Sequence, residues 1–136
     1  MLEARAVNRY IGSSPRKMRL VIDLIRGKSV DEALTMLHYQ PKHAARVAEK
    51  VLRSAVSNLH NKDEGSRAES HDLFVKEVFV NGGPSMKRVL PAPMGRAFRM
   101  VKRSNHLTII IAQKPVRAKK AAPAKSKATV QESKEK

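Results

Sequence analysis

The sequence predicts an α+β domain, with three helices packed on a small antiparallel sheet and a long protruding β-hairpin arm. Three segments between residues 14 and 60 carry apolar residues at helical spacing. Two runs rich in Val, Ile and Phe, residues 73–80 and 107–112, are typical of strands. The segment between them, residues 81–106, is basic, contains Gly and Pro, and has no acidic residue. These observations favour a two-layer fold in which the long connection extends away from the domain.

The N-terminal part of the chain predicts a strand followed by a helix. Residues 2–11 are expected to form a short strand. Ser14 can occupy the N-cap of the first helix, Pro15 suits its first turn and Gly27 ends it. The predicted buried stripe of this helix is formed by Met18, Val21, Ile22 and Ile25. Three basic residues lie outside the stripe and are expected to face solvent or phosphate: Arg16, Lys17 and Arg19.

Two further helices follow directly. Ser29 and Glu32 form the capping-box pattern, which predicts the start of the second helix, and Pro41 bounds it. Its apolar stripe is predicted to contain Val30, Ala33, Leu34 and Leu37. The third helix is predicted for residues 42–60, which gives it a length of roughly 28 Å. Residues 61–71 are polar and are expected to form a loop.

The segment 81–106 is predicted to be the arm. Connections longer than about 12–15 residues are rare in compact domains unless they are functional or disordered. If strand pairing continues outward, about 13 residues per side give an arm near 40 Å in length. Gly82 and Gly83 permit a bulge where the arm leaves the sheet. A turn is predicted near residues 90–95, which contain two prolines and a glycine.

The charge of the chain indicates a polyanionic partner. Its formal net charge is +16, and residues 78–131 contain 12 Lys and Arg but no Asp or Glu. Such an excess is typical of proteins that bind nucleic acid or anionic membranes. The six basic residues of the arm have no acidic neighbour in sequence: Lys87, Arg88, Arg96, Arg99, Lys102 and Arg103. With two Tyr, three Phe and no Trp, serial base stacking on single strands is disfavoured.

Several classes of function have no support in the sequence. The chain has no Cys, its five His are scattered, and GGPSMKR lacks the spacing of a nucleotide-binding phosphate loop. We therefore expect no catalytic residue, metal site or other cofactor. No secretory or transit signal and no run of about 20 apolar residues is visible, so a cytoplasmic protein is expected. Residues 115–136 are rich in Ala, Lys and Pro and are predicted to be a disordered basic tail.

The net charge and the predicted arm are by themselves compatible with three kinds of partner. Folded RNA is the first, because basic extensions neutralise phosphates where RNA helices converge. Duplex DNA is the second, because architectural proteins insert basic β-arms with a Pro-containing tip into the minor groove. An anionic membrane is the third and weakest, since the apolar stripe of the first helix is needed for the core.

Three motifs point to one family. They are SPRKMRLVIDLIRGKSVDEALTML, KVLRSAVSNLHN and VFVNGGPSMKR…GRAFRMVKRSNHLTIII. In order and spacing they resemble the universal large-subunit ribosomal protein family number twenty-two, over about residues 2–114. The resemblance implies a single rRNA-binding domain, residues 1–114, with its hairpin at about 81–106. It further implies a structural constituent of the large subunit that assists assembly and lines the nascent-peptide exit tunnel.

The resemblance also implies partners and site residues. The expected partners are large-subunit rRNA, other large-subunit proteins including tunnel-lining protein number four, and the nascent peptide, with the chain a monomer within the ribosome. The rRNA-binding residues are expected among the nine basic residues of the first helix and the arm named above. The tunnel-lining residues would be Met86, Lys87, Arg88, Pro91, Ala92, Pro93, Met94 and Gly95. The resemblance further implies that Met86, Lys87 and Arg88 belong to a segment where changes alter the response to macrolides.

Overall fold

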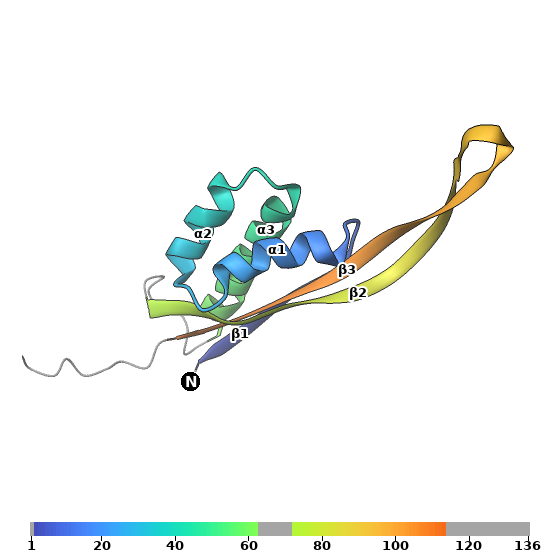
Figure 1. The fold of residues 1–136 in the computed structure, drawn as a ribbon. Coiled ribbons are helices and arrows are strands. Elements are labelled where there is room, and N and C mark those ends of the chain that lie inside the picture. The colour runs from blue at the N-terminus through green and yellow to red at the C-terminus, as the bar shows by residue number, and fades with distance from the viewer. Residues whose placement is uncertain (1, 63–71, 114–136) are drawn as a thin grey trace, which may run out of the picture.

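The computed structural model describes residues 2–62 and 72–113, and its arrangement confirms the predicted α+β class with a protruding hairpin (Figure 1). The elements in chain order are β1 (Glu3–Ile11), α1 (Pro15–Ile25), α2 (Val30–Tyr39), α3 (His43–His60), β2 (Leu73–Pro91), the short 3-10 turn η2 (Pro93–Gly95) and β3 (Ala97–Gln113). The predicted tail, residues 115–136, and most of the predicted loop at 61–71 lie outside the described residues.

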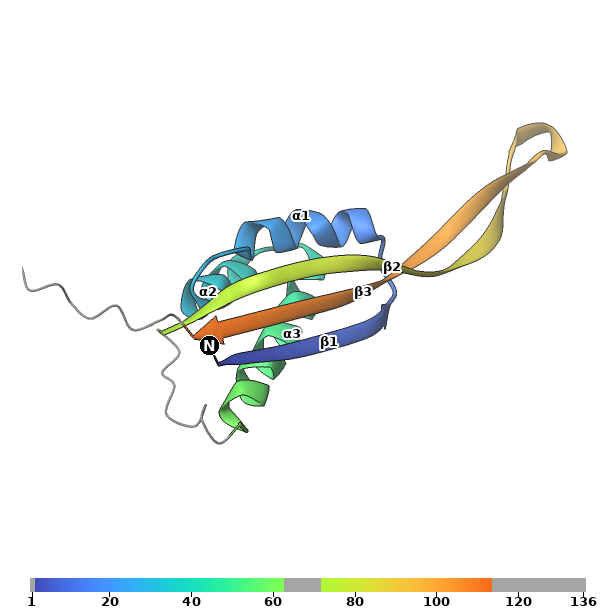
Figure 2. The same ribbon diagram turned by 90° about the horizontal axis from the view of Figure 1, so that it is seen from below.

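The three strands form one antiparallel sheet in the order β1–β3–β2, so β3 is the central strand. The helices cover one face of this sheet, and the opposite face carries no helix of the described chain (Figure 2). The rows of the covered face are apolar. Ala4 pairs with Ile111, which pairs with Val75 on its other side, and Ala6, Ile109 and Val78 form the next row.

The core lies between this face and the helices. The predicted stripe of α1 is buried in full, and Leu52, Ala55 and Leu59 of α3 are also inaccessible to solvent. The alanines of α3 leave little side-chain bulk between that helix and the sheet, which allows the two layers to approach closely. One residue departs from expectation. Leu34 is only partly buried, because it lies at the margin of the α2 stripe beside Ala33 and Leu37.

The helix ends follow the local sequence. The Ser29 side chain accepts a hydrogen bond from the Glu32 backbone N–H at 3.4 Å, as expected for the start of α2. Ser14 occupies the N-cap of α1, but its side chain makes no capping hydrogen bond. Gly27 adopts a φ of +75°, a left-handed conformation that favours glycine, and its N–H donates to the Val75 carbonyl at 3.1 Å. The turn after α1 is thereby tied to β2.

The arm is the continuation of β2 and β3 beyond the sheet. The two strands remain paired from Leu73–Gln113 to Pro91–Ala97, well beyond the runs at 73–80 and 107–112 that the apolar pattern marks. From residue 81 outward, no side chain of β2 is buried. The outer part of the hairpin therefore takes no share in the core (Figures 1 and 2).

Candidate nucleic-acid interface

The pairing register of the arm distributes its charges evenly. Its outer rows are Ser85–Arg103, Met86–Lys102, Lys87–Val101, Arg88–Met100, Val89–Arg99 and Leu90–Phe98. In each of the first five rows one residue is a cation and its partner is uncharged. Like charges directly opposite one another destabilise a strand pair. This register therefore lets a ribbon carry many cations without placing two of them face to face.

The same register places cations on both faces of the ribbon. Directly opposite residues share a face, and successive rows alternate between the two faces. Lys102 and Arg88 therefore lie on one face, whereas Arg103, Lys87 and Arg99 lie on the other. All five are exposed. A ribbon that lay flat on a surface would need cations on one face only, so this arm is suited to anionic surroundings on both sides.

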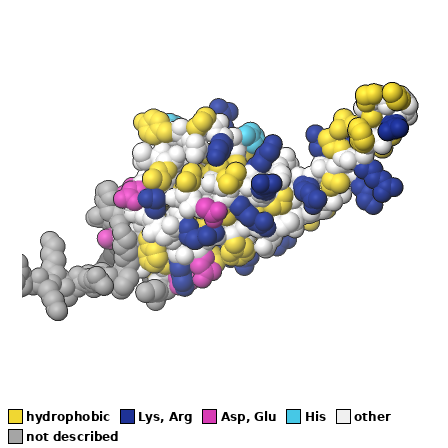
Figure 3. Space-filling model, viewed as in Figure 1, with side chains coloured by type: hydrophobic (Ala, Val, Ile, Leu, Met, Phe, Trp, Pro, Cys, Tyr) yellow, Lys and Arg dark blue, Asp and Glu magenta, His cyan; other side chains and the backbone are white. Residues whose placement is uncertain are grey.

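The six basic residues of the arm have no acidic partner within residues 2–62 and 72–113. On the face seen in Figure 3, Lys and Arg side chains follow the arm and gather on the domain near its base, while Asp and Glu lie on the globular part. Arg88 Nη2 makes a weak contact within the arm, 3.9 Å from the Met86 sulfur. These charges are thus available to an external anion.

The tip of the arm is uncharged. In η2, Met94 and Gly95 both adopt positive φ values, 60° and 69°, and the Ala92 N–H donates to the Arg96 carbonyl at 2.9 Å. The predicted turn near residues 90–95 is confirmed. Met94 is 93% exposed. The predicted tunnel-lining residues fall into two parts of the arm. Residues 91–95 form the tip, with Pro91 still paired to Ala97, whereas residues 86–88 lie farther from the turn in the paired part of the hairpin, the shaft.

Two irregularities mark the base of the arm. The register of β2 against β3 shifts between Gly82 and Ser85, as the Gly-Gly pair predicts, and that of β1 against β3 shifts between Asn8 and Ile11. An ideal Cβ on Gly83 would lie 2.6 Å from the Ser104 hydroxyl and 3.2 Å from the Ser104 backbone carbon, so a side chain there would have to displace that hydroxyl and shift β3 slightly. The second irregularity was not predicted. In the structure this register shift coincides with a positive φ of 57° at Tyr10.

Side chains of β3 anchor this base to the domain. Asn105 is fully buried, and its Nδ2 donates to the Ser13 carbonyl at 2.7 Å and lies 2.9 Å from the Ser13 hydroxyl. The Tyr10 backbone N–H donates to His106 Nδ1 at 3.0 Å, and the two rings meet edge to face. Sequence reasoning missed these roles of Asn105 and His106, because both residues resemble ordinary polar strand residues until their neighbours are known.

The basic residues of α1 divide into two groups. Arg19 Nη2 donates to the Val80 carbonyl at 3.3 Å and so stabilises the contact between α1 and β2. Arg16 and Lys17 are exposed at the start of the helix. Lys17 lines a hollow together with Lys102 and Arg103 of the arm. The structure thus joins two predicted sets of basic residues that are more than 80 positions apart in sequence, but Arg16 does not line this hollow.

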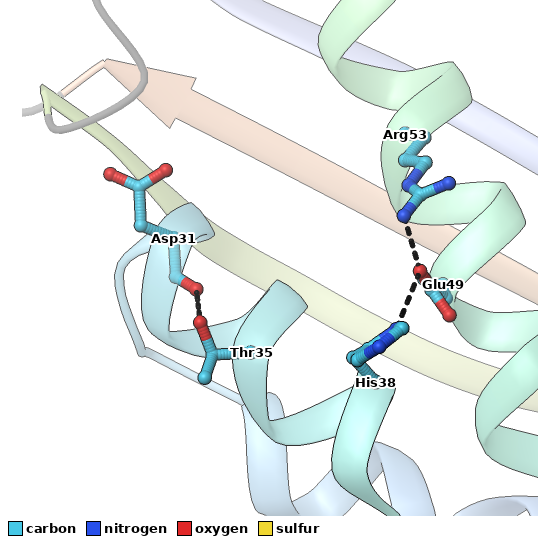
Figure 4. A network of polar contacts seen from close by, with 5 residues as sticks. All are labelled: Asp31, Thr35, His38, Glu49 and Arg53. Atoms are coloured by element: carbon cyan, nitrogen blue, oxygen red, sulfur yellow. Dashed lines mark hydrogen bonds and ion pairs between the residues drawn. The ribbon is translucent and has the colours of Figure 1, made fainter.

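Polar contacts link residues of α2 and α3 within the globular domain. Glu49 of α3 lies 2.5 Å from Arg53 and 3.8 Å from His38 of α2, and its side chain is mostly buried (Figure 4). The Thr35 hydroxyl donates to the Asp31 carbonyl at 2.9 Å within α2. The contact between Glu49 and His38 joins α3 to α2, whereas the Thr35 hydrogen bond lies within α2. Among the described residues, no group of three potential ligands could hold a metal ion, and no helix has the length and apolar character to span a membrane.

Comparison with known proteins identifies the family. Residues 6–112 match the family described as Ribosomal protein L22p/L17e. The chain belongs to this family. It is 54% identical over 110 residues to a large ribosomal subunit protein uL22 from Chlorobium phaeobacteroides, an alignment that covers 81% of this chain and 94% of that protein. It is 50% identical over 113 residues to the uL22 of a Thermoanaerobacter species, covering 83% of this chain and 99% of the relative.

Membership of the L22p/L17e family indicates where in the cell the chain is located. A third relative, a uL22 from Chlorobaculum tepidum, is 52% identical over 110 residues, covering 81% of this chain and 92% of that protein. The chain is accordingly a structural constituent of the large ribosomal subunit and is located on the ribosome. The matched region spans both the globular domain and the whole of the arm.

Proposed function

We propose that the chain binds rRNA through its arm and the adjoining face of the globular domain, and that this binding assists assembly of the large subunit in cytoplasmic ribosomes. Residues 1–114 would act as one rRNA-binding unit. The observation that carries the proposal is the arm itself, a paired ribbon with exposed cations on both faces and no acidic partner among the described residues. Folded RNA offers phosphates on every side of an inserted ribbon, which suits this arrangement.

The arm also supports a role in the exit tunnel. A ribbon about 40 Å long, from its rise of roughly 3.3 Å per residue, can carry an uncharged tip far from the domain that anchors it. We propose that the tip, residues 91–95, and the shaft segment 86–88 line the tunnel, near the tunnel-lining ribosomal protein number four and beside the nascent peptide. An uncharged tip suits this place, because it would not hold passing chains by their charge.

Binding of rRNA is tested by removing the six basic residues of the arm. Replacement of Lys87, Arg88, Arg96, Arg99, Lys102 and Arg103 by Gln should flatten the slope of log K against log salt by roughly 4 to 5, at about 0.7–0.9 per phosphate contact. The measurement is binding of a large-subunit rRNA transcript over a range of salt concentrations, with duplex DNA as competitor. An unchanged slope would assign the affinity to α1, and preference for the duplex would contradict the proposed binding of folded rRNA.

The tunnel role is tested by two deletions in the shaft. Removal of residues 86–88 shifts everything beyond by an odd number, so Val89 and Leu90 exchange faces, whereas removal of 86–87 preserves their faces. Both deletions leave the core residues in place and should permit incorporation into ribosomes. The odd deletion should change macrolide sensitivity more than the even one. Failure of either variant to incorporate would show that the arm is required for assembly.

A further inference from the structure

A basic hollow lies where the arm leaves the domain. Its volume is about 720 Å³, which falls within the range of roughly 300–1,000 Å³ typical of ligand sites. Three segments of the chain line it: the turn into α1, the start of α3, and β3 at the base of the arm. Each segment contributes at least one cation, and none of the lining residues is acidic. The cations are Lys17, Lys42, Lys102 and Arg103, with His43 beside them.

The topology explains why the hollow is open. β1 is paired with β3 only as far as Ile11 and Asn105, and the chain then turns through Gly12 toward α1. Beyond Asn105, outward to Ala97, β3 is therefore paired with β2 alone. The hollow occupies the notch on the unpaired side, next to residues 101–103. One wall belongs to the domain and the other to the arm.

The electrostatics of the hollow favour an anion. Within residues 2–62 and 72–113, no carboxylate forms an ion pair with any of the four cations. Like charges gathered around one hollow repel one another, and the repulsion is relieved when an anion lies between them. The four cations are the main source of the positive potential in the hollow. The N-termini of α1 and α3 add to the same positive potential, since neither has a side-chain cap.

We propose that this hollow binds the phosphodiester backbone of folded RNA and that the bound phosphates bridge the domain to the arm. The inference rests on the proposed rRNA-binding function and extends it to a defined site. Lys17 and Lys42 hold the backbone from the domain side, and Lys102 and Arg103 hold it from the arm side. In the free protein the repulsion between the two walls opens the notch. Bound phosphates draw the walls together and fix the direction in which the arm leaves the domain.

The first test measures RNA binding by a variant of the domain wall. K17Q/K42Q should lower the slope of log K against log salt for a large-subunit rRNA transcript by about 1.4–1.8, from two phosphate contacts at 0.7–0.9 each. The matched control is K28Q/K50Q, which removes the same charge from residues that do not line the hollow. K17R/K42R should restore the wild-type slope. Circular dichroism verifies that all variants are folded.

The outcomes separate this inference from the proposed function. If the wild type binds and K17Q/K42Q loses no more slope than K28Q/K50Q, the hollow is not a phosphate site and rRNA binding by the protein stands. If the wild type does not bind the transcript, the proposed function itself fails. A larger loss in K17Q/K42Q than in the control, restored by Arg, supports the hollow.

The second test measures the direction of the arm without RNA. The chain has no Cys, so spin labels at Met94→Cys and Tyr39→Cys report the distance from the tip to α2; both positions are exposed. Tripolyphosphate serves as the probe for contiguous phosphates. Its addition should narrow the distance distribution in the otherwise native chain but not in the K17Q/K42Q background. No narrowing in the native chain, or equal narrowing in both backgrounds, would overturn the proposal.

Discussion

The globular domain and the arm are built from the same two strands but are stabilised in different ways. In the domain, Val78 and Ile109 form a row of β2 and β3 that is covered by the helices and almost inaccessible to solvent. In the arm, Lys87 and Val101 form an equivalent row with both faces open. The backbone pairing is the same, so the difference lies in what the side chains contact.

This difference shows which contacts stabilise the conformation of each region. Burial of apolar surface stabilises the domain by about 25 cal/mol per Å². The side chains that bury this surface all belong to the chain itself. The arm has only its backbone ladder and its cross-strand pairs, and a two-stranded ribbon of that kind is marginal in water. The domain is therefore specified by the chain alone, whereas the arm is specified jointly by the chain and the polyanion that we propose surrounds it.

The largest expected contrast is in amide exchange of the free protein. Within the single strand β3, amides at Ile109 and Ile111 should exchange only through global opening, while those at Arg99 and Val101 should exchange by local fraying. The rates should differ by about 1,000-fold or more, since global opening of a domain costs about 5 kcal/mol or more. Addition of rRNA should slow exchange in the arm. Strong protection across residues 87–103 without RNA would contradict the comparison.

Substitution of one aliphatic residue in each region tests the same contrast through stability. Ile109→Ala removes a fully buried side chain from the central strand and should lower the free energy of unfolding by about 2–5 kcal/mol. Val89→Ala in the arm, where the side chain is 69% exposed, should change it by less than about 0.5 kcal/mol. Urea denaturation measures both. Comparable losses would mean that the arm contributes to the folded core.

The junction between the two regions is sharpened by a pair of glycine substitutions. Gly83→Ala places a methyl group against Ser104 and should destabilise the protein by about 1 kcal/mol through overpacking. Gly82→Ala is the control, because nothing lies within 4 Å of its Cβ position. Thermal unfolding of the two variants provides the measurement. If both behave alike, the close approach of β2 to β3 at this point has no structural role.

The smallest effect is expected at the open face of the sheet. The Lys76 ammonium forms an ion pair with the Glu3 carboxylate, which raises the pKa of Lys76. A Lys with a raised pKa contributes stability below its unfolded pKa and loses it as pH rises through the folded pKa. Glu3→Gln should therefore lower the melting temperature slightly at neutral pH, with the difference vanishing at strongly alkaline pH. A difference that persisted there would have another cause.

The sequence predicted local features well where one side chain or a short spacing decides them. The stripe of α1, the Ser29 cap, the bulge at Gly82 and the turn near 90–95 were each predicted and are confirmed. Leu34, which was predicted in the stripe of α2, packs against the core but is only partly buried, because helical spacing identifies a face but not the edge of its contact area. The hollow at the arm base was missed, since its residues come from three distant segments.

The sequence by itself determined the fold class, the arm, the excess of positive charge and the resemblance to a ribosomal family, because each depends on composition, on periodicity or on motifs within short segments. Only the tertiary structure decided which cations share a face of the arm, since a register shift at Gly82 moves every outer row of the ladder. It also decided that Lys17 and Lys42 line the same hollow as Lys102 and Arg103. That arrangement depends on where β1 ends its pairing with β3, a property of the packed sheet that no single segment encodes.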